Sequence, residues 1–176
     1  MGFAGVAFAM EFFKTSRLRL RNLALCDLDA LYDCRNHEEC RRYQRWDALS
    51  RKDIEAYIRT FQNDLFLSSK AEQHFAICLD TNALVGELAY FYNEEERCVT
   101  LGITIAYQHH RKGFAYEMLT EAIRRIRARY PAMDIVGLID KENVKSIRLF
   151  EKLGFEREGY AESIASYVYV LYGKSE

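Results

Sequence analysis

Three strand-like segments joined by short turns occupy the middle of the sequence. They are residues 74–80, 83–92 and 97–106. The connections have two and four residues and are polar, which predicts an antiparallel meander. A helical segment that begins after Gly113 and a further strand at 133–140 come next. A strand, a helix and a strand in series need a parallel crossover, so the predicted sheet is mixed.

The segments on either side complete an α+β pattern. Residues 16–22 alternate basic side chains with leucine, which predicts a half-buried strand. Residues 26–43 indicate two short helices separated near Asn36, and Ser50 begins a weak capping box for another helix. The last segment, 155–173, indicates one or two strands. We therefore expect a mixed sheet with helices on both faces.

The size and charge of the chain indicate one ordinary domain. Its 176 residues are almost half apolar, at 49%, and carry a formal net charge of −1. These values suit a domain with a substantial core and give no electrostatic reason to expect nucleic-acid binding. We place the domain at residues 10–176. Residues 1–9 form an apolar stub that is too short to cross a bilayer and lacks a basic start, so no membrane partner is expected.

Cysteine and histidine usage indicates an intracellular protein without a metal. The five cysteines are odd in number and show no CxxC spacing, which is typical of reduced thiols in the cytoplasm. None of the four histidines has a second histidine four residues further along a helix. We therefore expect a cytoplasmic protein with no metal site.

The sequence QHHRKGFAYEML, residues 108–119, joins the third strand of the meander to the following helix. The first turn of a helix has unpaired N–H groups and a partial positive charge, so anions bind there when the backbone is accessible. Gly113 and Ala115 allow close approach, and Arg111 and Lys112 add charge. Neither GxxxxGK[ST] nor GxGxxG is present. On these residues alone, an ordinary strand-to-helix turn with solvated basic side chains is the favoured interpretation.

A second helix begins at Asn143, whose side chain suits the N-cap position. The apolar side chains that follow lie at helical spacing, at Val144, Ile147, Phe150 and Leu153. Gly154 ends the helix.

Four segments together resemble the GNAT (GCN5-related) N-acetyltransferase superfamily, in the order of that family. They are TSRLRLRNLALCDLDALYDCRN, ALVGELAYF with TLGITI, HRKGFAYEML and NVKSIRLFEKLGF. The similarity extends from Thr15 onward and is greatest to the subgroup of ribosomal-protein N-terminal and diamine acetyltransferases. The resemblance implies a mostly antiparallel mixed sheet in which two central strands splay apart.

The resemblance also implies acetyl-CoA as the acyl donor. The residues expected to hold its diphosphate are His110, Arg111, Lys112, Gly113, Phe114 and Ala115. The pantetheine arm is expected to pair like an added strand with backbone groups of Ile103 and Ile105, and Asn143 is expected to contact it. The splay is expected to begin at a bulge near Gly102.

The implied reaction is direct attack of a primary amine on the thioester through a tetrahedral intermediate. Glu87 is a candidate general base, although an outward-facing strand position would also explain it. A backbone N–H near Ile105 is suited to the oxyanion. Ser146 is a candidate partner for the departing thiolate, or simply a first-turn residue bonded to Asn143. Phe150 is also expected to contact the cofactor, and it occupies the position where the family often has a proton-donating tyrosine.

The acceptor is left open between a small-molecule amine and a protein N-terminus, and a homodimer is also left open. Two non-enzymatic alternatives compete with the acetyltransferase. One is an acyl-CoA-binding or regulatory module of the same fold, which the absence of a tyrosine at Phe150 favours. The other is an adapter domain without a cofactor. Fold resemblance alone does not choose among these functions.

Overall fold

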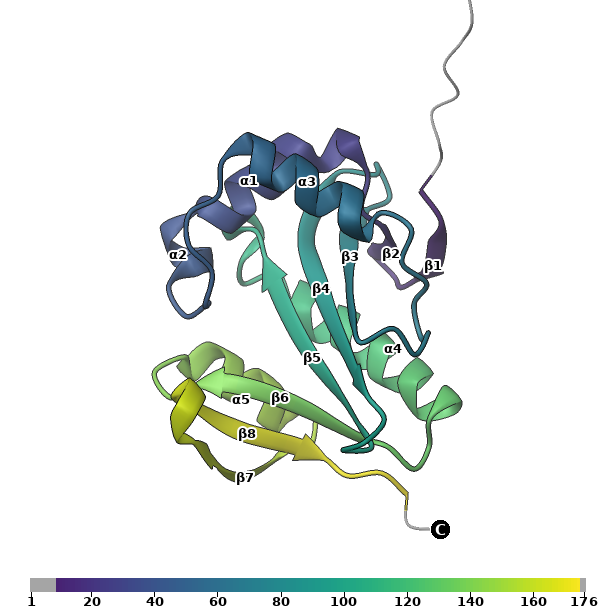
Figure 1. Ribbon diagram of the computed structural model, residues 1–176, viewed down its shortest axis with the longest axis vertical. Helices are drawn as coiled ribbons and strands as arrows, with labels where there is room; N and C mark the ends of the chain where they lie inside the picture. Colours follow the sequence, from purple (N-terminus) through teal and green to yellow (C-terminus); the bar gives the residue numbers. More distant parts are fainter. Residues whose placement is uncertain (1–8, 175–176) are drawn as a thin grey trace, which may run out of the picture.

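Eight strands form a single sheet in the computed structural model, which describes residues 9–174. The strands are β1 (Glu11–Lys14), β2 (Leu18–Asn22), β3 (Glu72–Leu79), β4 (Leu84–Asn93), β5 (Cys98–Ile105), β6 (Asp134–Asp140), β7 (Glu156–Ala161) and β8 (Ser166–Leu171). Their order across the sheet is β1-β2-β3-β4-β5-β6-β8-β7 (Figure 1). Neighbours are antiparallel except β5 and β6, which are parallel. The predicted mixed, mostly antiparallel sheet is confirmed.

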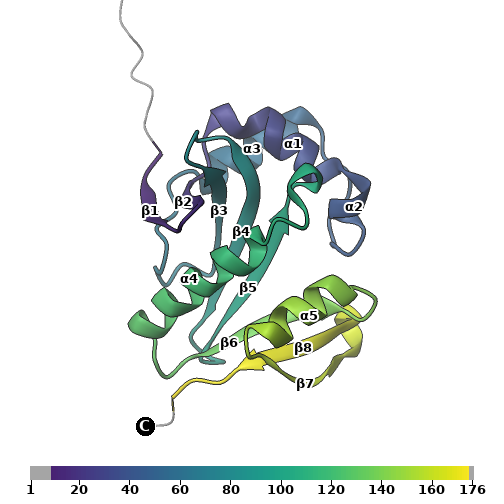
Figure 2. The ribbon, with the colours of Figure 1, turned by 180° about the vertical axis from the view of Figure 1, so that it is seen from behind.

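In the described part of the chain, five α-helices cover the two faces of the sheet. They are α1 (Leu28–Asn36), α2 (Glu38–Arg41), α3 (Arg51–Phe61), α4 (Phe114–Arg129) and α5 (Val144–Lys152). Helices α1 and α3 lie on one face, whereas α4 and α5 lie on the other, as the view from behind shows (Figure 2). Short 3-10 helices lie at Leu25–Asp27, Tyr107–His109 and Glu162–Ile164.

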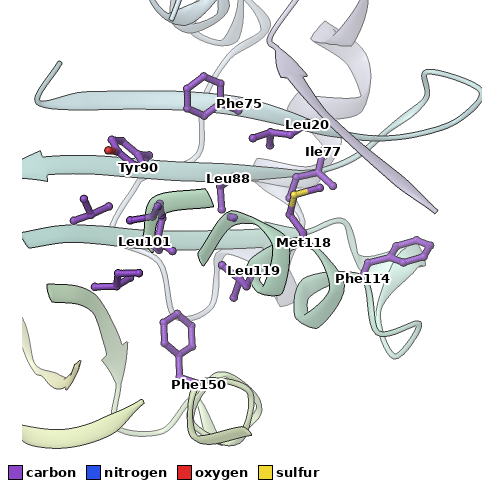
Figure 3. Packing of buried hydrophobic residues seen from close by; sticks show 14 of the residues in the cluster. Leu20, Phe75, Ile77, Leu88, Tyr90, Leu101, Phe114, Met118, Leu119 and Phe150 are labelled. Carbon is purple, nitrogen blue, oxygen red and sulfur yellow. The ribbon is translucent and has the colours of Figure 1, made fainter. Parts of the chain in front are cut away.

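The alternation of side chains along the central strands divides the core between these two faces. In β3, Phe75 and Ile77 join the cluster under α4, whereas Ala76 and Cys78 join the cluster under α1 and α3. Figure 3 shows Met118 of α4 among the apolar side chains of the sheet. All five side chains are fully buried, so both faces of β3 lie inside the molecule.

Strand β5 has a full-length partner on one side only. It pairs with β4 from Cys98 to Ile105 but with β6 at only three positions, Cys98, Val99 and Thr100. Beyond that point the two strands diverge (Figure 1), because β6 continues along β8 up to Asp140. The predicted splayed pair is therefore confirmed.

The expected bulge near Gly102 is wrong. The register between β4 and β5 runs without a shift through the pair Ala89↔Gly102. A register shift occurs instead between β3 and β4, at Ile77 and Cys78. The splay results from β6 leaving β5 rather than from a distortion within β5.

Most predicted element boundaries agree with the structure. The helix break near Asn36 is confirmed, and Ser50 and Asp53 form both hydrogen bonds of the capping box. The C-terminal segment forms two strands. Strand β1 was not predicted, and the proposed stub at 1–9 lies outside the described residues except for residue 9. Within residues 9–174, no helix has both the length and the apolar character needed to cross a membrane.

Phe150 joins α5 to the sheet at the start of the splay. Its side chain is 4% exposed, and Figure 3 shows it pointing from α5 toward the core. A Cβ atom at Gly137 would lie only 2.2 Å from Cε1 of the Phe150 ring. Gly137 is the first β6 residue beyond the last pair with β5. A glycine is therefore needed there for the ring to reach the strand.

Replacing Phe150 with alanine is expected to destabilise the protein by about 3–5 kcal/mol, because the ring is buried and its removal leaves a cavity. Urea unfolding measures the difference. Leu138→Ala is the matched control, because Leu138 on β6 is 46% exposed, and a change within about 0.5 kcal/mol is expected there. Equal losses in the two variants would contradict this account of the core.

Candidate active site

A cavity of about 630 Å³ lies beside the part of β5 that β6 has left. Its walls come from the end of β5, the turn before α4, the start of α5, and α2 with the residues after it. Segments far apart in the sequence therefore meet around one space. Among the predicted site residues, those lining it are Ile103, Ile105, His110, Arg111, Gly113, Phe114, Ala115, Asn143 and Ser146.

The backbone of β5 faces this cavity with unpaired groups. The Arg97 carbonyl accepts the N–H of Asp134 at the start of β6, at 3.0 Å. Backbone groups alternate sides along a strand, so those of Ile103 and Ile105 point to the same side as the Arg97 carbonyl. At these two residues β6 is no longer paired with β5. The Ile105 carbonyl already accepts hydrogen bonds from His110 Nε2 at 2.8 Å and Cys40 Sγ at 3.4 Å. The N–H of Ile105 and both backbone groups of Ile103 have no partner among residues 9–174, so they are left for a ligand.

The turn before α4 has the backbone shape that an anion site needs. Arg111 and Gly113 both have positive φ, 61° and 77°, and Gly113 is the N-cap of α4. The first intrahelical bond is from Glu117 N–H to the Gly113 carbonyl, at 3.1 Å. Among residues 9–174, no acceptor pairs with the N–H groups of Arg111 through Ala115. These donors therefore remain available at the positive end of the helix.

Two of the residues predicted to hold the diphosphate, His110 and Lys112, do not offer a free group to the cavity in the expected way. The His110 N–H donates to the Tyr107 carbonyl at 3.0 Å, so the contribution of this residue is the side-chain bond to Ile105. Lys112 does not line the cavity, and its Nζ donates to His109 Nδ1 at 3.3 Å. Burial and the Lys112 charge both lower the pKa of His109.

Asn143 caps α5 and also faces the cavity. Its Oδ1 accepts the backbone N–H of Ser146 at 3.2 Å, which confirms the capping interpretation. The amide nitrogen of Asn143 and the hydroxyl of Ser146 have no partner among residues 9–174. Both groups can therefore bond a ligand. Phe150 lies outside the cavity lining, in the core below it.

Glu87 lies on the opposite face from α4, under α1 and α3. Its carboxylate is 4% exposed and accepts two hydrogen bonds from Arg35, at 3.0 and 3.2 Å, and one from the Tyr57 hydroxyl. His74 Nδ1 lies 3.0 Å from Glu87 Oε1. Burial raises the pKa of Glu87, but His74 and Arg35 outweigh burial and hold it at about 2. The structure thus places Glu87 in a buried ionic network, outside the cavity lining.

One wall of the cavity was not predicted. It comes from α2 and the residues after it, where Cys40 contacts the Ile105 carbonyl and Gln44 Nε2 donates to Thr104 Oγ1 at 3.4 Å. The His37 ring stacks on Tyr107 with centroids 4.4 Å apart. Nothing in the sequence marks these residues, because their role depends on where α2 docks. Within the described part of the chain, His, Cys, Asp and Glu form no group of three suited to a metal ion.

Comparisons with known proteins agree with this geometry. A family model described as acetyltransferase (GNAT) domain matches residues 17–156. The uncharacterised N-acetyltransferase p20 of Bacillus licheniformis is 28% identical over 155 residues, covering 85% of each chain. A solved Vibrio cholerae spermidine N-acetyltransferase, in complex with CoA and spermine, has a TM-score of 0.71 at 24% identity, covering 89% of this chain and 95% of that one. RimL, a ribosomal-protein alpha-N-acetyltransferase, has a TM-score of 0.77 at 15% identity, covering 96% and 97%.

Glu87→Gln is expected to destabilise the protein near neutral pH by about 3–5 kcal/mol, because it leaves Arg35 buried without its anion. An ionised Glu87 stabilises the folded state above its unfolded pKa, and this contribution is lost as the pH falls from 4.5 to about 2. The difference in the free energy of unfolding between Glu87→Gln and the unchanged protein, measured by urea unfolding, should therefore shrink as the pH falls over that range. Glu55→Gln, at a 43% exposed partner of Arg59, should show little effect at any pH. A constant difference for Glu87→Gln would contradict the assignment.

Proposed function

The chain belongs to the GNAT acetyltransferase family, and we propose that it transfers an acetyl group from acetyl-CoA to a primary amine by direct attack. One observation carries this proposal. Among residues 9–174, the unpaired N–H groups at the start of α4, the N–H of Ile105 and both backbone groups of Ile103 open into the same cavity. A diphosphate and a strand-like amide arm are the two parts of acetyl-CoA that such groups recognise.

The chain offers a donor for each part of the cofactor. The N–H groups from Arg111 to Ala115 suit the diphosphate, and Arg111 lines the same cavity. Ile103 presents both an N–H and a carbonyl to the amides of the pantetheine arm. Asn143 lines the cavity at the start of α5, and its amide nitrogen has no partner among residues 9–174, so it is a further donor suited to the arm. The arm would therefore occupy the place that β6 vacates.

The acetyl group would then lie beside the end of β5. As the amine attacks, negative charge grows on the thioester oxygen, and the Ile105 N–H is the donor suited to hold it. The bond to sulfur breaks next, and the hydroxyl of Ser146, which lines the cavity, is the donor suited to the leaving thiolate. Phe150 supplies no proton, but a thiol of pKa ~8.5 leaves without a strong acid.

The proton on the attacking amine constrains the acceptor. Glu87 as general base remains a prediction, and a carboxylate with a pKa of about 2 is a weak base. A lysine-like amine of pKa ~10.4 holds its proton far more tightly at neutral pH than an α-amine of pKa ~8. The structural relatives named above act on spermidine and on a ribosomal-protein α-amine. Both acceptor classes stay within this proposal, and the weak base favours the α-amine.

Gly113→Glu is expected to abolish acetyl-CoA binding, because the new side chain adds negative charge and strain at a residue with φ of 77°. Acetyl-CoA at about 100 times its Kd should stabilise the unchanged protein by about 2.7 kcal/mol. A thermal shift assay measures that gain. Gly159→Glu is the control, because a Cβ there would meet no atom of residues 9–174 within 4 Å apart from its own chain neighbours, and it should keep the full shift. A full thermal shift in Gly113→Glu would contradict the proposal that the diphosphate binds at this turn.

Acetyl-CoA consumption with a panel of spermidine, free amino acids and peptide α-amines tests the enzyme against a non-catalytic acyl-CoA-binding module. Release of CoA should depend on the amine, and a peptide α-amine is expected to be used most efficiently. Direct attack also predicts that the protein incubated with acetyl-CoA alone carries no acetyl thioester on Cys40, the cysteine that lines the cavity. Intact-protein mass spectrometry detects such a thioester, and its presence would replace direct attack by a two-step route.

A further inference from the structure

The turn before α4 is held from behind by a residue about a hundred positions earlier in the sequence. Arg17 lies in the tight turn between β1 and β2, where Thr15 N–H donates to the Leu18 carbonyl at 2.8 Å and Leu18 N–H to Thr15 Oγ1 at 3.1 Å. Its guanidinium lies over the Phe114 ring, 4.8 Å from the centroid. Arg17 is not part of the cavity lining. It therefore supports the turn from the side away from the cavity.

Two acceptors, the Glu117 carboxylate and the Lys112 carbonyl, fix the orientation of the planar Arg17 guanidinium. Nε donates to Glu117 Oε2 at 2.7 Å, with Nη2 2.6 Å from the same oxygen, while Nη1 donates to the Lys112 carbonyl at 2.8 Å. Glu117 Oε1 accepts in turn from the Arg17 N–H at 2.9 Å and from Thr15 Oγ1 at 2.6 Å. A planar guanidinium can serve both acceptors at once, whereas a lysine ammonium is a single point of charge.

The bond to Lys112 orients the peptide that follows. In a trans peptide the C=O and the next N–H point in opposite directions. The Lys112 carbonyl points to Arg17, outside the cavity, so the Gly113 N–H points the other way, toward the cavity that Gly113 lines. Without Arg17, the carbonyl dipole is free to turn toward the anion. The charge of Glu117, in the first turn of α4, would then also lack its partner.

We infer that Arg17 and Glu117 form a positioning clamp that keeps the Gly113 N–H aimed at the diphosphate of the acyl donor. This inference rests on the proposed acetyl-CoA site. Neither residue contacts the reacting atoms, and Glu117 acts through Arg17. The clamp sets the affinity for donors that carry a diphosphate and leaves the acetyl transfer step itself unchanged.

Arg17→Met tests the clamp in the full chain, with CoA binding followed by calorimetry and turnover followed with two donors. The Kd for CoA and the KM for acetyl-CoA should rise about tenfold, the loss expected for one misaligned hydrogen bond to a charged group, with kcat nearly unchanged. S-acetylpantetheine lacks the diphosphate, so its kcat/KM should be the same in both proteins. Arg17→Lys should show a smaller loss. The double variant Arg17→Met with Glu117→Gln should lose no more than Arg17→Met alone.

Glu121→Gln is the matched control, because Glu121 lies on the same helix and pairs with Arg124 and Arg125 at 2.7 and 2.6 Å. It should leave both donors unaffected. Normal CoA affinity in Arg17→Met would overturn the clamp while leaving the proposed function intact. Equal losses with acetyl-CoA and S-acetylpantetheine would also overturn it, since they indicate general damage. Failure of the unchanged protein to bind CoA would instead reject the proposed cofactor site.

Discussion

Strand β5 keeps one neighbour along its whole length and loses the other after three residue pairs, and the candidate site depends on that difference. Unpaired backbone groups inside a protein cost free energy unless water or a ligand satisfies them. Here they face a cavity of about 630 Å³ rather than the core. A cofactor arm that pairs like a strand would complete the sheet at the point where β6 has left it.

The two sides of the cavity are built by different kinds of interaction. On the α4 side, apolar packing of Phe114, Met118 and Leu119 fixes the helix whose first turn carries the free N–H groups. On the α1 side, the buried pair of Arg35 and Glu87 ties the helices to β4. Helix α2 follows α1 directly, so this pair also places Cys40 against the end of β5.

Features that depend only on neighbouring residues in the sequence were predictable. The meander strands alternate regularly, and Ser50 and Asn143 are caps that act within three residues of themselves. Strand β1 has only four residues and little alternation to reveal it. The bulge expected near Gly102 was wrong because a register shift is a property of two strands, and β4 keeps Gly102 in an even ladder.

The sequence by itself determined the strands of the sheet other than β1, the helices at Gly113 and Asn143, and the glycine that allows an open turn at positive φ. Alternation, capping and backbone sterics act over a few residues, so a single chain segment contains all the information they need. Tertiary structure decided that Glu87 faces Arg35 rather than the cavity, and that Arg17 reaches Glu117 across a separation of 100 residues. Contacts of that kind depend on how the sheet twists and where the helices dock, which no local pattern specifies.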